Sequence, residues 1–144
     1  MKKRILQAIR ECWNLPVFEY IKMSEFFKRI LTVYNILDVF ELNETSTVVL
    51  YGRNSYNWIA IYIACLLKGV RLLIIHPDMY KLEVVHITLL TNTNHIFIDP
   101  DLVFENLGKN PFLNTLISTE TLRVIFEKGD KTVYSILAEI LVSS

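Results

Sequence analysis

The alternation of short apolar runs with helical segments of about ten residues is the feature that most constrains how this chain folds. The runs 47–51, 72–75 and 95–98 have the continuous apolar, β-branched character of buried parallel strands. Between them lie two segments whose apolar residues recur at helical spacing. Repeated strand–helix–strand units place right-handed crossover helices against a mostly parallel sheet. The sequence therefore predicts an α/β fold, a Rossmann-like layer with helices on both faces.

Three helices have boundaries that are predicted from capping residues. Ser24 is the expected N-cap of the first helix, and Asn54 and Ser55 are the expected caps of the second, which should end at Gly69. The third helix is expected after the turn at Pro77. The spacing predicts one apolar face on each helix, formed by Phe27, Ile30, Leu31, Tyr34 and Leu37, by Ile59, Tyr62, Ile63, Leu66 and Leu67, and by Leu82, Val85, His86, Leu89 and Leu90.

The remaining elements are shorter. We expect an N-terminal helix over 3–13, and a short helix opened by Asp99 and Pro100 and ended by Gly108. Two more strands are expected over 113–117 and 122–126, and a last helix is expected after Thr132. The prediction is one domain, 1–144, with a helical part at 1–45 and strand–helix repeats at 46–144.

The charge balance excludes a general nucleic-acid binder. Lysine plus arginine number 15 and aspartate plus glutamate number 15, so no long-range positive field is expected. The uncharged run 58–67 is too short for the roughly 20 residues that span a bilayer, and no signal-peptide cleavage site follows the basic start. We therefore expect a cytoplasmic protein in which Cys12 and Cys65 are reduced.

The turn after the first strand is the main candidate for a binding site. It follows the carboxyl end of a strand and opens a helix whose N–H groups can receive an anion. The candidate anion-binding residues are Arg53, Asn54 and Ser55, although Asn54 and Ser55 can simply cap the helix. A single glycine at this turn argues against a dinucleotide site.

Catalytic and metal sites have no residue-level support. The histidines are not spaced like metal ligands, so no metal site is expected among His76, His86 and His95. No serine stands in the strained turn that serine hydrolases use, so no catalytic residue is predicted.

Several segments follow one another in a specific order: 23–26, 48–55 with Trp58, and 66–69, continued by His86 and by the strand 96–98 that runs into Asp99. Together they resemble the beginning of the AMP-dependent acyl-CoA synthetases, most closely the long-chain fatty acid CoA ligases. The likeness covers about residues 20–110. It implies a partial N-terminal domain of the acyl-CoA synthetase fold, with scaffold positions at Ser24, Gly52, Trp58 and Gly69.

The same resemblance implies that this chain alone is not a competent ligase. The family uses ATP, Mg and CoA, but its glycine-rich phosphate loop, its ribose-binding aspartate and its C-terminal catalytic lysine have no counterpart here, and all four glycines are isolated. We therefore expect the chain to bind none of these cofactors by itself. Arg71 and Ile74 also depart from the family pattern, and Arg71 indicates an edge strand or a strand end.

Two functions follow from these observations. The first is a truncated N-terminal scaffold segment, which would expose apolar surface and form a dimer or bind the remainder of a synthetase. The second is a stand-alone binding or interaction module for a protein partner, an acidic small molecule or a CoA-like group. Its ligand would lie at the strand ends near Arg53, His76 and Asp99.

Overall fold

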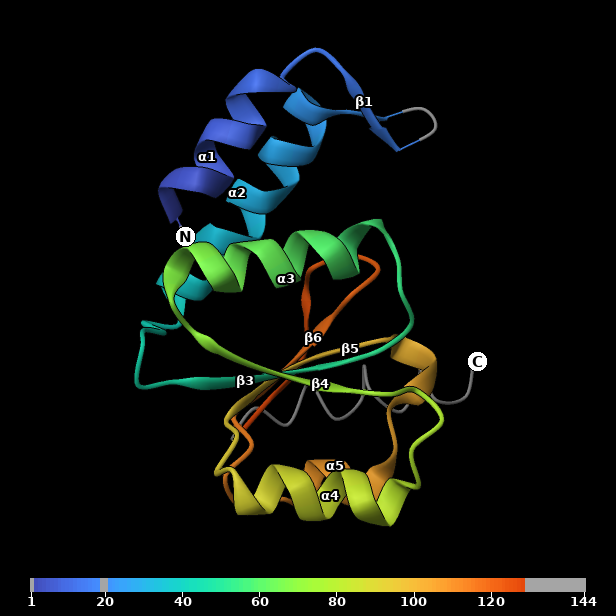
Figure 1. Ribbon diagram of the computed structural model, residues 1–144. Helices are drawn as coiled ribbons and strands as arrows, with labels where there is room; N and C mark the ends of the chain where they lie inside the picture. The colour runs from blue at the N-terminus through green and yellow to red at the C-terminus, as the bar shows by residue number, and fades with distance from the viewer. Residues whose placement is uncertain (1, 19–20, 129–144) are drawn as a thin grey trace. The chain divides into compact units, whose positions relative to one another are not determined.

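The computed structural model describes residues 2–18 and 21–128 (Figure 1). They form two compact units, and each is described by itself. The helical unit contains the described residues up to Ser46 together with Ile59–Arg71, and the sheet unit contains Thr47–Trp58 and the described residues from Leu72 onward. The predicted division of the domain into a helical part at 1–45 and strand–helix repeats at 46–144 stays a prediction. The helix expected after Thr132 lies outside the described residues.

In the helical unit, a small hairpin precedes the long helix. The chain runs through α1 (Lys2–Glu11), β1 (Pro16–Phe18), β2 (Ile21–Lys22) and α2 (Met23–Val39), and α3 (Tyr56–Lys68) lies mostly in this unit. Strands β1 and β2 pair antiparallel, a hairpin that the sequence did not predict. The helix expected at 3–13 is confirmed by α1.

Ser24 is not the N-cap of α2, so that prediction is wrong. The helix begins at Met23, its N-cap position is Lys22, and no side chain caps it. The reason is that β2 runs directly into the helix. Backbone bonds hold this junction, because Met23 N–H donates to the Leu15 carbonyl at 2.9 Å and Ser24 N–H donates to the Trp13 carbonyl at 3.0 Å.

The apolar faces predicted for three helices are wrong in part. The side chains actually buried are Phe26, Ile30, Val33 and Leu37 in α2, Asn57, Ala60, Ile61, Ala64, Cys65 and Leu67 in α3, and Val84 and Thr88 in α4 (Lys81–Leu90). Six residues that were assigned to the apolar faces are exposed: Leu31, Tyr62, Leu66, Leu82, His86 and Leu90. Apolar residues such as Leu31, Leu66 and Leu82 lie outside the buried faces of these helices, so spacing alone does not identify the face that packs.

The sheet unit confirms the predicted fold class. Its described strands are β3 (Thr47–Tyr51), β4 (Arg71–Ile75), β5 (His95–Ile98), β6 (Thr115–Ser118) and β7 (Val124–Glu127), in the order β4-β3-β5-β6-β7. Strand β5 is parallel to both β3 and β6, and β7 is antiparallel to β6. The sheet is therefore mostly parallel, and Arg71 lies on an edge strand as expected.

One face of the sheet carries a continuous apolar core with α4 and α5 (Glu105–Gly108), which lie on the same side of the strands in Figure 1. Its buried members come from strands β3, β4, β5, β6 and β7, from both helices and from the loops between them, and they include Val49, Tyr51, Val84, Ile96, Ile98, Val103, Leu107, Leu116 and Phe126. The opposite-facing residues Val48, Leu50 and Phe97 are also buried, so neither face of these strands is exposed to water.

The prediction of a single helix between Asp99 and Gly108 is wrong. The segment divides into a short 3-10 helix, η1 (Pro100–Leu102), and α5. Val103 between them is extended, with φ −66° and ψ 134°. Its side chain is buried in the core cluster, so tertiary packing overrides the local helix signals at this position.

His95 makes the stability of the sheet unit depend on pH. Its ring is buried, its Nδ1 lies 2.5 Å from Thr115 Oγ1, and burial lowers the pKa of the imidazole. The folded state therefore keeps His95 neutral, whereas the unfolded chain takes up a proton near pH 6.5. The stabilising contribution is complete above that pH and is lost as the pH falls towards the folded pKa.

We predict that the free energy of unfolding falls between pH 7.5 and 5.5, by at most about 1.4 kcal/mol per pH unit from this one group. Urea unfolding curves at a series of pH values measure it. In His95→Gln this slope should become shallower, whereas His86→Gln, at an exposed position, should keep the wild-type slope. Equal slopes in wild type and His95→Gln would contradict the assignment.

Candidate functional site

The strand order places a topological switch point between β3 and β5. The chain passes from β3 to its neighbour β4 and then returns to the other side of β3 to form β5. In open α/β sheets, ligands bind outside the carboxyl ends of strands at such a point. Because Tyr51 is paired with Ile98 and Ile98 with Ser118, the strands β3, β5 and β6 end at the same level.

The residues that follow these three strands come together. Gly52 and Arg53 follow β3, Asp99 and Asp101 follow β5, and Thr119 follows β6. We call these five residues the strand-end cluster. Gly52 and Arg53 were singled out from the sequence, and the structure brings both to Asp99. From the sequence, Asp99 was expected to start a helix and to lie near the alternative binding site.

Asp99 is the centre of the strand-end cluster. Its carboxylate accepts hydrogen bonds from Arg53 N–H at 2.9 Å, from Arg53 Nη1 at 3.0 Å and from the Thr119 hydroxyl. The side chain is nearly buried and makes no capping bond to η1, although Asp99 occupies the N-cap position. The carboxylate therefore ties the ends of three strands together.

Arg53 is paired with a second carboxylate. Its Nη1 and Nη2 donate to the two oxygens of Asp101 at 3.0 and 2.9 Å. This bidentate hydrogen bonding raises the pKa of Arg53 and lowers that of Asp101. One guanidinium between two carboxylates leaves a net charge of about −1, so an anion that approaches Arg53 must compete with Asp99 and Asp101.

The phenol of Tyr51 lies beneath this charged group. Burial is the main reason that its pKa is raised, and the carboxylates of Asp101 and Asp78 add to the effect while Arg53 opposes it. A buried, neutral tyrosine here supports the end of β3 as part of the core, and its hydroxyl stays protonated at neutral pH.

Gly52 is required by close packing and not by its backbone angles. A Cβ on Gly52 would lie 2.7 Å from Asp99 Cγ and closer still to Oδ1. Real side chains do not approach a carboxyl group that closely. A residue without a side chain is therefore favoured at position 52, because the backbone after β3 lies against the Asp99 carboxylate. The family scaffold role of Gly52 stays a prediction.

Asn57 is the residue of this site that the sequence analysis missed. It lies in the first turn of α3, and its Nδ2 donates to the carbonyls of Thr119 at 2.6 Å and Glu120 at 3.1 Å. It thereby ties the β3–α3 turn to the loop after β6. A polar residue inside an apolar helix was the available signal.

The other predicted site residues have local roles. Ser55 Oγ accepts the Trp58 N–H at 3.1 Å, which confirms Ser55 as a helix cap, and Asn54 is exposed. Gly69 follows α3 with φ +80°, the left-handed conformation that favours glycine at a helix end. His76 Nδ1 accepts the Asp78 N–H within its own turn, so it is held there by a local bond.

Within residues 2–18 and 21–128, no group of three or more His, Cys, Asp or Glu side chains is arranged to hold a metal ion. In the same ranges, no helix is long and apolar enough to cross a membrane.

Comparison with known proteins identifies the fold. No protein-family model and no curated protein matches this sequence. The red-emitting luciferase of Phrixothrix hirtus matches with a TM-score of 0.71 at 14% identity, over 96% of this chain and 35% of the luciferase. The anthranilate CoA ligase AuaEII, solved with anthranoyl-AMP, matches with a TM-score of 0.66 at 15% identity, over 78% of this chain and 24% of the ligase.

A third structure agrees with these two. The o-succinylbenzoate CoA synthetase of Bacillus subtilis, solved with its acyl-adenylate intermediate, gives a TM-score of 0.63 at 13% identity, over 79% of this chain and 31% of the synthetase. The chain has the fold of a partial domain of the adenylate-forming enzymes. It spans about a quarter to a third of the length of these adenylate-forming neighbours.

Proposed function

We propose that this chain is an N-terminal scaffold segment of an adenylate-forming CoA ligase of the long-chain fatty acid type. The strand-end cluster is the observation that carries the proposal. Its polar groups hydrogen-bond to one another and join the ends of β3, β5 and β6, which is a structural role. The likeness to part of the adenylate-forming fold and the sequence resemblance over residues 20–110 support it. As a ligase segment, the chain would work in the cytoplasm.

In this proposal the adenylation chemistry belongs to residues outside these 144. The glycines occur singly, so no stretch of the sequence offers the successive backbone N–H groups that wrap a nucleotide phosphate. We therefore expect the 144-residue polypeptide to be inactive alone and to bind neither ATP with Mg nor CoA. Carboxylate-dependent exchange of pyrophosphate into ATP, assayed with octanoate and palmitate, should stay at background. Exchange above background would overturn the proposal.

We also propose that the polypeptide associates with itself when it is studied alone. Large apolar side chains are exposed in both units, among them Val39 at 76% and Leu90 at 70%. Apolar surface of this kind is stabilised by burial against a partner, and a two-fold dimer is the commonest arrangement.

We expect sedimentation velocity at micromolar concentration to show a dimer. Lysine introduced at the contact should raise the dissociation constant at least tenfold, so Val39→Lys and Leu90→Lys, measured separately, show which unit carries the interface. A wild-type monomer of 16.8 kDa at these concentrations would contradict self-association.

The alternative is a binding module for an acidic small molecule at the switch point. The position of Arg53 at the carboxyl end of β3 favours it. An anion would have to displace Asp101, the more exposed of the two carboxylates, from the guanidinium. Under this alternative, AMP or CoA raises the melting temperature of the wild type but not of Arg53→Gln. An unchanged melting temperature across ATP, AMP, CoA and fatty acids would exclude it.

A further inference from the structure

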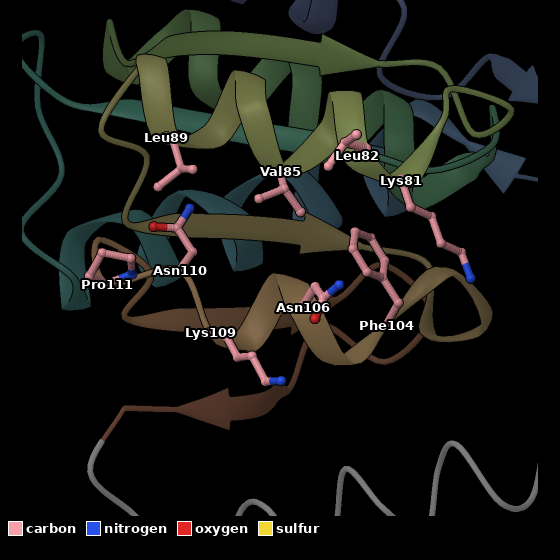
Figure 2. A pocket seen from close by; sticks show the side chains of 9 residues that line it. All are labelled: Lys81, Leu82, Val85, Leu89, Phe104, Asn106, Lys109, Asn110 and Pro111. Carbon is pink, nitrogen blue, oxygen red and sulfur yellow. The ribbon is translucent and has the colours of Figure 1, made fainter.

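A groove lies between α4 and α5 on the outside of the sheet unit. Figure 2 shows Val85 and Leu89 pointing from α4 towards the segment that contains α5. The cavity has a volume of about 320 Å³, at the small end of the range for small-molecule sites. Its lining consists of Lys81, Leu82, Val85, Leu89, Phe104, Asn106, Lys109, Asn110 and Pro111.

The floor of the groove is apolar because α4 turns its less buried side towards it. Val84 and Thr88 face the core, so Val85 and Leu89 on the adjoining side are only half-buried, and Leu82 is 82% exposed. Phe104 packs against the core cluster and closes one end of the groove. An apolar surface of this shape favours a ligand with an apolar body.

The far end of the groove is held in place by Asn110. Its Nδ2 donates to Thr88 Oγ1 at 2.9 Å and its Oδ1 accepts the Phe112 N–H at 2.9 Å. Both polar atoms of the Asn110 side chain make hydrogen bonds within the protein. Asn110 therefore shapes the groove and is not the group that binds a ligand. The groove is therefore built on fixed positions.

The charged residues that line the groove are two lysines. Lys81 and Lys109 line it from opposite sides, and the lining includes no carboxylate. Lys81 Nζ lies 5.5 Å from the centre of the Phe104 ring, and Lys109 Nζ lies 3.4 Å from a Glu105 oxygen in an exposed pair. An exposed ion pair of this kind is weak, so the Lys109 ammonium can turn from Glu105 to an anion in the groove. The Lys81 ammonium, which lies over the Phe104 ring, can reach the same anion.

We propose that this groove binds a small amphipathic carboxylate, an apolar chain with one carboxylate group. The chain lies over Val85 and Leu89, and the carboxylate is bound by Lys81 or Lys109. This site is separate from the strand-end cluster and independent of the proposed function.

Amide NMR of the 144-residue protein tests the proposal with three ligands that share an eight-carbon chain: octanoate, octanol and octyltrimethylammonium. Octanoate should shift the amides of Val85, Leu89 and Phe104 and bind about fivefold more tightly than octanol, whereas the cation should bind more weakly than octanol. Shifts confined to Arg53 and Thr119 would instead assign the carboxylate to the strand-end cluster and overturn the groove.

The double variant Lys81→Gln/Lys109→Gln separates charge recognition from apolar binding. It should lower the affinity for octanoate to that for octanol and leave octanol binding unchanged. Lys28→Gln, which removes an exposed lysine of α2, should bind octanoate like the wild type. Unchanged octanoate affinity in the double variant, or equal binding of all three ligands, would overturn the proposal.

Discussion

Gly52→Ala should lower the free energy of unfolding by about 2–3 kcal/mol, since overpacking at a rigid site costs roughly 1–3 kcal/mol. The added methyl group would lie 2.7 Å from Asp99 Cγ. The carboxylate cannot move aside cheaply, because Arg53 and Thr119 hold it from two sides. Equilibrium unfolding in urea measures the change.

Gly108→Ala is the matched control for this variant. A Cβ at Gly108 meets only Phe126 Cε2, at 3.9 Å, which is ordinary contact. The free energy of unfolding of Gly108→Ala should change by less than about 1 kcal/mol. It should rise, because alanine has a higher helix propensity than glycine in α5. Equal destabilisation by the two substitutions would show that close approach to Asp99 is not the reason for Gly52.

Asp99→Ala should be the most destabilising single substitution in the strand-end cluster, by about 3 kcal/mol. It removes the acceptor of three hydrogen bonds and leaves the Thr119 hydroxyl and the Arg53 backbone N–H without that partner. Hydrogen bonds to charged groups contribute about 1.5–3 kcal/mol each, and unpaired buried donors add to the loss. Thermal and urea unfolding both report it.

Asp101→Asn is the comparison for Asp99→Ala. Its side chain is 51% exposed and its partner Arg53 is 56% exposed, so the change should be below about 1 kcal/mol. In addition, Gly52→Ala should cost less than about 1 kcal/mol when Asp99 is already alanine, because the carboxyl group is gone. Additive effects of the two substitutions would show that Gly52 and Asp99 act independently.

Most of the fold could be predicted from sequence because the strands have a strong local signal. The runs that became β3, β4 and β5 are apolar and β-branched, and Gly69 stops α3 at a position that needs φ +80°. The helix faces could not be predicted in the same way. In α4, Leu82 and Leu90 are more apolar than Thr88, yet Thr88 is the residue that is buried, and a hydrogen bond from Asn110 to its hydroxyl offsets the cost of burying a polar group.

The candidate site was predicted in its position but not in its chemistry. The turn at Gly52 and Arg53 was predicted as the binding position because it follows the carboxyl end of a strand and opens a helix. That Asp99 and Asp101 both meet Arg53 depends on the order of the strands, which places residues 46 and 48 positions apart side by side. Asn57 was missed for the same reason, since its partners follow β6, 62 and 63 residues later.

If this chain is a scaffold segment of an adenylate-forming ligase, as we propose, it occurs in cells as part of a longer polypeptide. The most direct test is the size of the native polypeptide in its source cells, detected with an antibody raised against these 144 residues and identified by mass spectrometry. We expect a polypeptide several times larger than 16.8 kDa whose peptides include a Ser-, Thr- and Gly-rich phosphate loop. A native polypeptide of 16.8 kDa that occurs without any such longer chain would show that the scaffold proposal is wrong.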